Sequence, residues 1–168
     1  MRPVLLMLAS LAMACSLDPV HDEAVADLGP EVAGIAEGPL HRAGQPCLVC
    51  HDGSTAQPAM SVAGTVNAVL GSSTPLAGAS VSLTDITSSM FVAKTNAAGN
   101  FYVEPGAFRP VFPLHVEISF GGYTSIMTTI VGRNGSCAAC HVDPPSRISV
   151  GAVYLAPVAA LVPDGGVP

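Results

Sequence analysis

Short segments in which apolar and polar residues alternate fill the chain between residues 61 and 133. The clearest is LHVEISF at 114–120, whose apolar residues fall on one face while His115 and Glu117 fall on the other. Strands at a spacing of about ten residues, separated by turns rich in Gly, Ser, Asn and Pro, are typical of a sandwich. The sequence therefore predicts an all-β fold, an antiparallel β-sandwich of about seven strands. The other expected strand positions are 62–66, 81–83, 91–93, 101–103, 124–131 and 147–155.

Three stretches of this region carry a family resemblance: VAGTV at 62–66, PLAGASVSLTD at 75–85 and TNAAGNFYV at 95–103. They resemble the carboxypeptidase regulatory-like (transthyretin-like, or prealbumin/Ig-like) β-sandwich module, over about 70–85 residues. The resemblance implies the sandwich fold. It implies a structural or interaction role for the sandwich and assigns no catalytic residue.

The amino end indicates export. Val4 to Ala14 form an apolar run of 11 residues behind Arg2, about 16 Å long as a helix and too short to cross a bilayer core of about 30 Å. The small residues ahead of Cys15 resemble a bacterial lipobox, although the usual Leu falls one place early, at Leu11. We expect residues 1–14 to be a signal peptide and the protein to lie in the periplasm or at the outer membrane, lipid-anchored through Cys15. Soluble export with a free thiol is the alternative.

Charge narrows the choice of partners. The chain has 168 residues and a net charge of −6, which disfavours nucleic acid as a partner. Half of its 12 acids lie between residues 16 and 40, where no Lys or Arg occurs: Asp18, Asp22, Glu23, Asp27, Glu31 and Glu37. Residues 15–40 are therefore interpreted as an acidic tether, with one short helix near 23–28. The Pro- and Gly-rich end, 156–168, is expected to be a loose tail.

Two pentapeptides carry the candidate chemistry: CLVCH at 47–51 and CAACH at 137–141. Cys-x-x-Cys-His is the signature of c-type haem attachment, in which two thiols add to the haem vinyl groups and the His binds the iron. Two such motifs use four of the five cysteines, and Cys15 is the fifth. The motifs resemble those of multihaem c-type cytochromes.

That resemblance implies two covalently bound haems c. The thioethers would form at Cys47, Cys50, Cys137 and Cys140, and the proximal ligands would be His51 and His141. The haem-attachment segments then span residues 41–60 and 134–146, on either side of a sandwich at 61–133, with a last strand at 147–155.

Other uses of the cysteines stay open. Each Cys-x-x-Cys pair is able to close a local disulfide, which an oxidising compartment favours. The four cysteines are also able to share one zinc, although the 86 residues between Cys50 and Cys137 disfavour this. Thioredoxin-like redox activity is disfavoured because no βαβ pattern surrounds either motif.

Electron transfer calls for a second axial ligand on the iron. Three His remain outside the motifs: His21, His41 and His115. His41 and His115 are the expected second ligands. His41 precedes the first motif in a segment broken by Pro and Gly, and His115 is expected on the outer face of its strand, where a haem packed against the sandwich would meet it. Met60 is the alternative that would raise the potential, whereas Met90 and Met127 fall in strand patterns and are expected in the core.

The sequence thus favours an exported dihaem cytochrome that exchanges electrons with protein redox partners in the envelope and is not an enzyme. The alternative is an extracytoplasmic structural or interaction lipoprotein whose Cys-x-x-Cys pairs are disulfide or zinc staples. A dihaem enzyme such as a peroxidase is disfavoured by the short chain and by the lack of an acid–base pair beside either motif.

Overall fold

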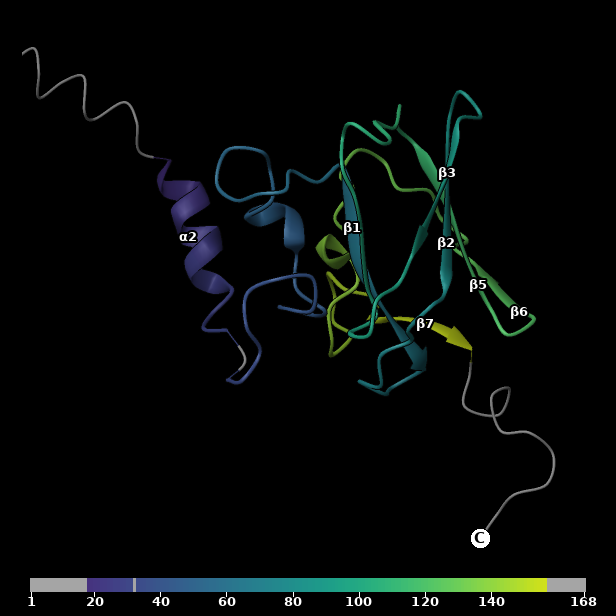
Figure 1. Cartoon of the computed structure of the whole chain (residues 1–168), viewed down its shortest axis with the longest axis horizontal. Helices are drawn as coiled ribbons and strands as arrows, with labels where there is room; N and C mark the ends of the chain where they lie inside the picture. Colours follow the sequence, from purple (N-terminus) through teal and green to yellow (C-terminus); the bar gives the residue numbers. More distant parts are fainter. Residues whose placement is uncertain (1–17, 32, 157–168) are drawn as a thin grey trace, which may run out of the picture. The chain divides into compact units, whose positions relative to one another are not determined.

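The computed structural model describes residues 18–31 and 33–156 (Figure 1). Its described residues contain seven strands in two sheets, which confirms the expected all-β sandwich fold. The strand order is β4-β1-β7 in the three-stranded sheet and β3-β2-β5-β6 in the four-stranded sheet. The strands are β1 (Val62–Val69), β2 (Ser80–Asp85), β3 (Met90–Lys94), β4 (Asn100–Val103), β5 (Leu114–Phe120), β6 (Tyr123–Ile126) and β7 (Val153–Ala156).

The chain divides into two units, 1–30 and 31–168. The first contains helix α2 (Pro19–Asp27), whose N-cap Asp18 accepts a hydrogen bond of 3.0 Å from the N–H of His21. This capped helix begins earlier in the chain than the helix expected near 23–28 because Asp18 and Pro19 form a helix start. None of its residues is buried, in keeping with an acidic segment. Residues 1–14, expected to be a signal peptide, and Cys15 lie outside the described residues, as does the expected tail from 157 onward.

Strand pairing follows the alternation in the sequence, with two corrections. All pairs are antiparallel except β1 and β7, which run parallel, with Val66 opposite Val153. The last strand begins at Val153, and residues 147–152 are not part of it. In addition, β6 ends at Ile126, although the backbone of 127–131 still pairs with β5 at single positions, such as Leu114 with Val131.

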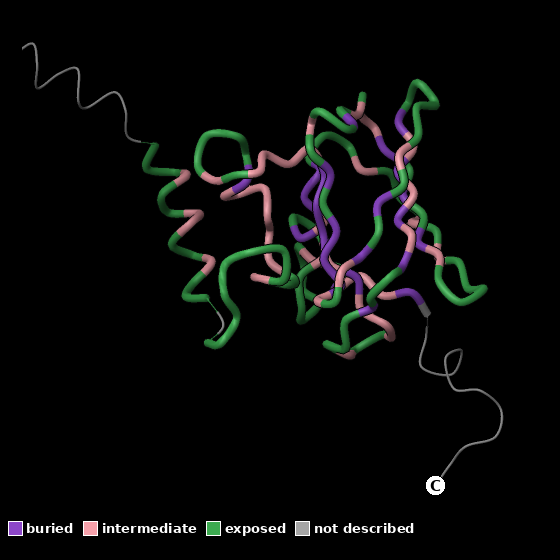
Figure 2. Tube along the Cα trace, in the orientation of Figure 1, coloured by how far each residue is buried: buried purple, intermediate pink, exposed green. Residues whose placement is uncertain are grey.

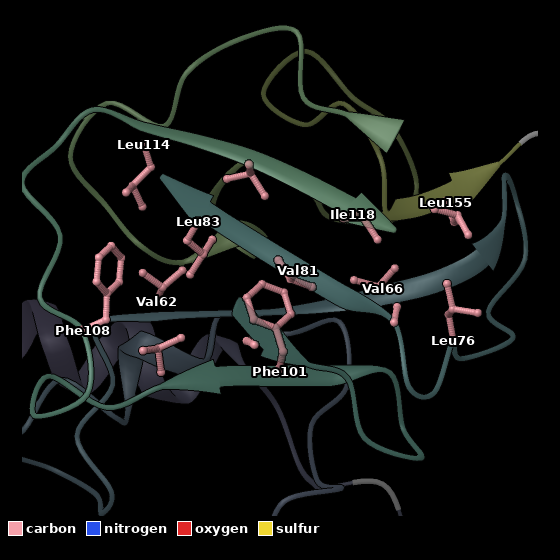
Figure 3. Close-up of a cluster of buried hydrophobic side chains, with 14 residues drawn as sticks. Val62, Val66, Leu76, Val81, Leu83, Phe101, Phe108, Leu114, Ile118 and Leu155 are labelled. Atoms are coloured by element: carbon pink, nitrogen blue, oxygen red, sulfur yellow. The ribbon is translucent and has the colours of Figure 1, made fainter. Parts of the chain in front are cut away.

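The core lies between the two sheets (Figure 3). Leu83 and Leu114, together with Val66 and Val81, are fully buried. Removing each such side chain from water stabilises the fold by about 1.5–3 kcal/mol. Figure 2 shows that the buried positions follow the strands, whereas most of the connecting loops are exposed. The expectation for Met90 was wrong, since its side chain is 65% exposed.

The turn before β4 is closed by the side chain of Asn96. Its side-chain oxygen accepts hydrogen bonds from the N–H groups of Ala98 (2.9 Å) and Asn100 (3.1 Å). Gly99 has a φ of +74°, a left-handed conformation that favours glycine. This turn fixes Asn100 at the start of β4, beside β1.

Among residues 18–31 and 33–156, no helix is long and apolar enough to cross a bilayer.

Candidate functional site

The two Cys-x-x-Cys-His motifs fold into the same turn. In the first, the 3-10 turn η1 (Cys47–Val49) is closed by hydrogen bonds from the N–H groups of Cys50 (3.2 Å) and His51 (2.9 Å) to the carbonyl of Cys47. In the second, η2 (Cys137–Ala139), the corresponding bonds measure 3.1 and 2.9 Å. These bonds span only three or four residues, so a pentapeptide forms the turn without a longer helix. Each motif therefore holds its two cysteines and its His in one compact unit.

The two motif histidines are oriented in the same way. His51 Nδ1 lies 2.8 Å from the carbonyl oxygen of Pro58, and His141 Nδ1 lies 3.0 Å from that of Gly151. A carbonyl oxygen only accepts, so Nδ1 carries the proton and the lone pair of the neutral ring is on Nε2. Metal-bound histidines commonly have this arrangement, because the Nδ1–H bond fixes the ring and raises its basicity. Both histidines therefore present Nε2 as the metal-binding atom.

A loop after each motif supplies the carbonyl acceptor. In the first loop the N–H of Ala56 donates to the carbonyl of Cys50 (2.8 Å), and that of Met60 donates to the carbonyl of His51 (2.9 Å). The loop thus returns to the motif that it leaves, which holds Pro58 against the imidazole. The same contact places Met60, the alternative ligand, close to the first motif along the backbone.

The second loop closes on Ser149. Its hydroxyl accepts from the N–H of Val142 (2.7 Å) and lies 3.0 Å from the carbonyl of Cys140, to which Val150 N–H also donates (3.0 Å). These bonds return residues 149–151 to the motif and place the carbonyl of Gly151 against His141. They also explain why the last strand begins later than expected, since the backbone that would extend it is bonded to the motif.

Both motifs rest on the same strand, β1, through consecutive residues. At Gly64 a Cβ would lie 2.7 Å from the Cβ of Cys137 and 2.8 Å from its Sγ, so only glycine admits this cysteine. Next to it, the Thr65 hydroxyl accepts a hydrogen bond of 2.8 Å from the N–H of Gly44, just before the first motif. Figure 1 shows both 3-10 turns on one side of β1 and the four-stranded sheet on the other. The motifs, far apart in sequence, are therefore neighbours in the fold.

Burial favours the neutral form of two of the described thiols, Cys47 and Cys137. Burial, with a further contribution from the nearby Cys47, raises the pKa of Cys137 to about 12. Burial also raises the pKa of Cys47 above its usual value. Reactive cysteines of redox enzymes have a lowered pKa instead, so these two are poor nucleophiles as they stand.

All four described cysteines are free thiols. Within the described ranges, no three His, Cys, Asp or Glu side chains are gathered where one metal ion could bind. The described cysteines thus do not form the tetrahedral set of a structural zinc site in this structure.

His41 is the histidine that the fold brings to a motif. Its ring centroid lies 5.9 Å from that of His51, with the two planes inclined by 53°. Two imidazoles on opposite sides of one metal ion, with metal–nitrogen bonds of about 2 Å, have centroids about 6 Å apart. His41 Nδ1 is buried without a hydrogen-bond partner, 3.8 Å from a carboxylate oxygen of Glu31. The separation of the two rings therefore fits two imidazoles that bind one iron.

The other candidate ligands lie elsewhere. His115 points outward from β5, as expected, but this strand belongs to the four-stranded sheet and not to the sheet that carries the motifs. The structure thus brings His115 together with neither motif. His21 belongs to the other unit of the chain, where its N–H donates to the N-cap residue Asp18 of α2. Met127 is partly buried against the core, as expected.

Sequence reasoning missed the residues that position the motifs: Gly64, Thr65 and Asn100. A glycine within a strand pattern is a known sign that another chain segment approaches closely, so Gly64 offered a usable signal. Thr65 and Asn100 offered none, because their partners are backbone groups of a loop distant in the sequence.

Comparison with known proteins finds no family model, no curated protein and no solved structure that matches this chain.

Proposed function

We propose that this protein is an exported dihaem c-type cytochrome that carries electrons between redox partners of the cell envelope. The observation that carries the proposal is the repeated geometry of the two motifs. In both, a turn holds two cysteines and a His whose Nδ1 faces a backbone carbonyl. A chance Cys-x-x-Cys-His sequence has no reason to acquire the same supporting hydrogen bond twice.

The chain's own residues have defined roles in this proposal. When bound, haem would supply one-electron cycling between Fe(III) and Fe(II), with no bond made or broken in a substrate. The cysteine pairs 47/50 and 137/140 would hold it through thioethers. His51 and His141 would bind iron through Nε2, oriented by the carbonyls of the two loops. His41 would supply the second imidazole at the first motif, which favours a low-spin, six-coordinate iron of comparatively low potential.

The shared strand supports internal electron exchange. Gly64 contacts the second motif, and Thr65 holds the segment that leads into the first. Groups attached at the two turns would therefore be neighbours on one side of the sandwich. The four-stranded sheet, on the other side of β1, is left as the scaffold, in keeping with the structural role that the family resemblance implies.

The proposal includes the cell envelope as the location. Covalent haem attachment to this motif takes place outside the cytoplasm, and the first 14 residues resemble an export signal. Cys15, if lipid-modified, would anchor the protein to the membrane through the acidic segment next to it. Protein redox partners would then meet it at the membrane surface.

A pyridine haemochrome assay tests the proposal. The full chain is expressed for export together with a cytochrome maturation system, and haem is measured per protein. We expect two haems in the parent protein and one in each double variant, Cys47→Ala/Cys50→Ala and Cys137→Ala/Cys140→Ala. A colourless parent protein would refute the proposal that this protein is a cytochrome.

The same sample tests the alternative, an exported interaction module with stapled cysteines. Zinc bound at one equivalent, or a mass that corresponds to two disulfides, would support that alternative in a colourless protein. Circular dichroism of the parent and of both double variants serves as the control for folding.

A further inference from the structure

We infer that Asn100 is a positioning residue for His41, acting through the segment 38–45, and this inference rests on the proposed function. Asn100 is buried, 6% exposed, at the start of β4. Its side-chain amide donates to the carbonyls of His41 (3.1 Å) and Pro39 (3.3 Å). A buried amide with two donations to one loop fixes that loop's backbone more firmly than exposed contacts do.

The other atom of the amide is engaged as well. The Thr65 hydroxyl donates to Asn100 Oδ1 (2.7 Å) and accepts from the N–H of Gly44 (2.8 Å). Asn96 adds a further donation, of 2.6 Å, to the carbonyl of Pro39. Residues of β1, β4 and the turn before β4 thus hold the segment on both sides of His41. The His41 ring has no hydrogen bond at its buried Nδ1, which lies 3.8 Å from a carboxylate oxygen of Glu31. The hydrogen bonds that support its position near His51 are therefore those of the backbone clamp formed by Thr65, Asn96 and Asn100.

The clamp depends on the side-chain amide of Asn100, because the nitrogen and the oxygen of this group have opposite hydrogen-bonding roles. Only an amide both donates to the two carbonyls and accepts from Thr65. In Asn100→Asp, a carboxylate of the same shape keeps the bond from Thr65 but turns an oxygen toward two carbonyl oxygens. The substitution therefore detaches the segment that carries His41 with little change in packing volume.

The test is the visible spectrum of the full, haem-loaded Asn100→Asp protein. We expect haem content to stay at two per chain while one iron changes from low spin to high spin. Added imidazole, which replaces the displaced ligand, should restore the low-spin spectrum; a general loss of folding would not be reversed in this way. Thr65→Val should act in the same direction, and Thr65→Ser, which keeps the hydroxyl, should behave like the parent.

Asn67→Asp is the matched control. Asn67 lies on β1 opposite Tyr154, outside both haem-attachment segments, and its side chain takes no part in the hydrogen bonds that hold the segment 38–45. Hydrogen–deuterium exchange provides a readout that does not depend on haem. Amide exchange in peptides covering 39–45 should be about tenfold faster in Asn100→Asp and unchanged in Asn67→Asp.

The outcomes separate the inference from the proposed function. A parent protein with two haems, and an Asn100→Asp variant with an unchanged spectrum, would overturn the positioning role and leave the cytochrome standing. A high-spin change that imidazole does not reverse would also overturn it. A parent protein without haem would refute the proposed function itself, and the ligand role of His41 with it.

Discussion

Gly64 is the residue at which the three-stranded sheet touches the second motif. Besides the contacts to Cys137, a Cβ there would lie 3.0 Å from the ring of Phe101. Neither neighbour is free to move, since the cysteine belongs to a closed turn and the phenylalanine to the core. The close approach therefore makes this position specific for glycine.

Gly64→Ala should lower the free energy of unfolding by about 1–3 kcal/mol, the usual cost of overpacking. It should also reduce haem attachment at Cys137 and Cys140, because the turn is pushed off the strand. Urea unfolding and intact mass measure the two effects. Gly106→Ala is the control, since nothing lies within 4 Å of a Cβ there. Full haem loading in a destabilised Gly64→Ala protein would show that the contact serves the fold alone.

Two of the three histidines outside the motifs, His41 and His115, give a direct comparison. His41→Ala should convert one iron to high spin, because the ring beside His51 is lost. His115→Ala should leave the visible spectrum unchanged, since His115 lies on the other sheet. A changed spectrum in His115→Ala together with an unchanged one in His41→Ala would reverse the ligand assignment.

Asp85 makes stability depend on pH. The side chain of Thr87, then the N–H of Val111 and other backbone groups, donate to its carboxylate and hold its pKa below the usual value of 3.8. Because the pKa is lower in the folded state than in the unfolded state, the ionised form stabilises the fold above about pH 4. This stabilisation is lost as the pH falls through the folded-state value.

Asp85→Asn should therefore unfold at a lower urea concentration than the parent near neutral pH. The difference should shrink as the pH is lowered below about 4, where the parent carboxylate becomes protonated. Urea midpoints of both proteins across this range provide the measurement. A difference that stays constant with pH would mean that the charge of Asp85 is unimportant.

At the scale of elements, the alternation of apolar and polar residues predicts the strands of the sandwich but not where the last strand begins. Leu114–Phe120 forms β5 over the range that its pattern predicts. By contrast, residues 147–152 are diverted from the last strand by hydrogen bonds of Ser149 and Val150 to the second motif. The periodicity of apolar residues indicates which face of a strand a residue occupies. Backbone hydrogen bonds to a segment distant in the sequence produce no such pattern.

The packing of β2 in the core predicts which leucine substitution lowers the free energy of unfolding. Leu83 is fully buried, so Leu83→Ala should cost about 2–5 kcal/mol of unfolding free energy. Leu70, at the end of β1, is 53% exposed, and Leu70→Ala should have an effect well below that range. Both are measured by urea unfolding, and equal effects would contradict the described core.

At the scale of the whole molecule, the fold joins two motifs separated by 85 residues. The sequence contained the two motifs and predicted the sandwich between them, whereas the haem-binding role of the motifs stays a prediction. It did not predict that both rest on β1, because that meeting depends on Gly64 and Thr65 acting on segments far along the chain. The pairing of His41 with the first motif depends on the clamp at Asn100 in the same way.

The proposed electron carrier requires two haems bound covalently at these two turns. The intact mass of the exported protein under denaturing conditions decides this point, since only covalent groups survive. We expect a gain equal to two haems in the parent protein and to one haem in each double cysteine variant. A parent mass equal to that of the processed polypeptide, with or without disulfides, would show that no haem is attached and would contradict the proposal.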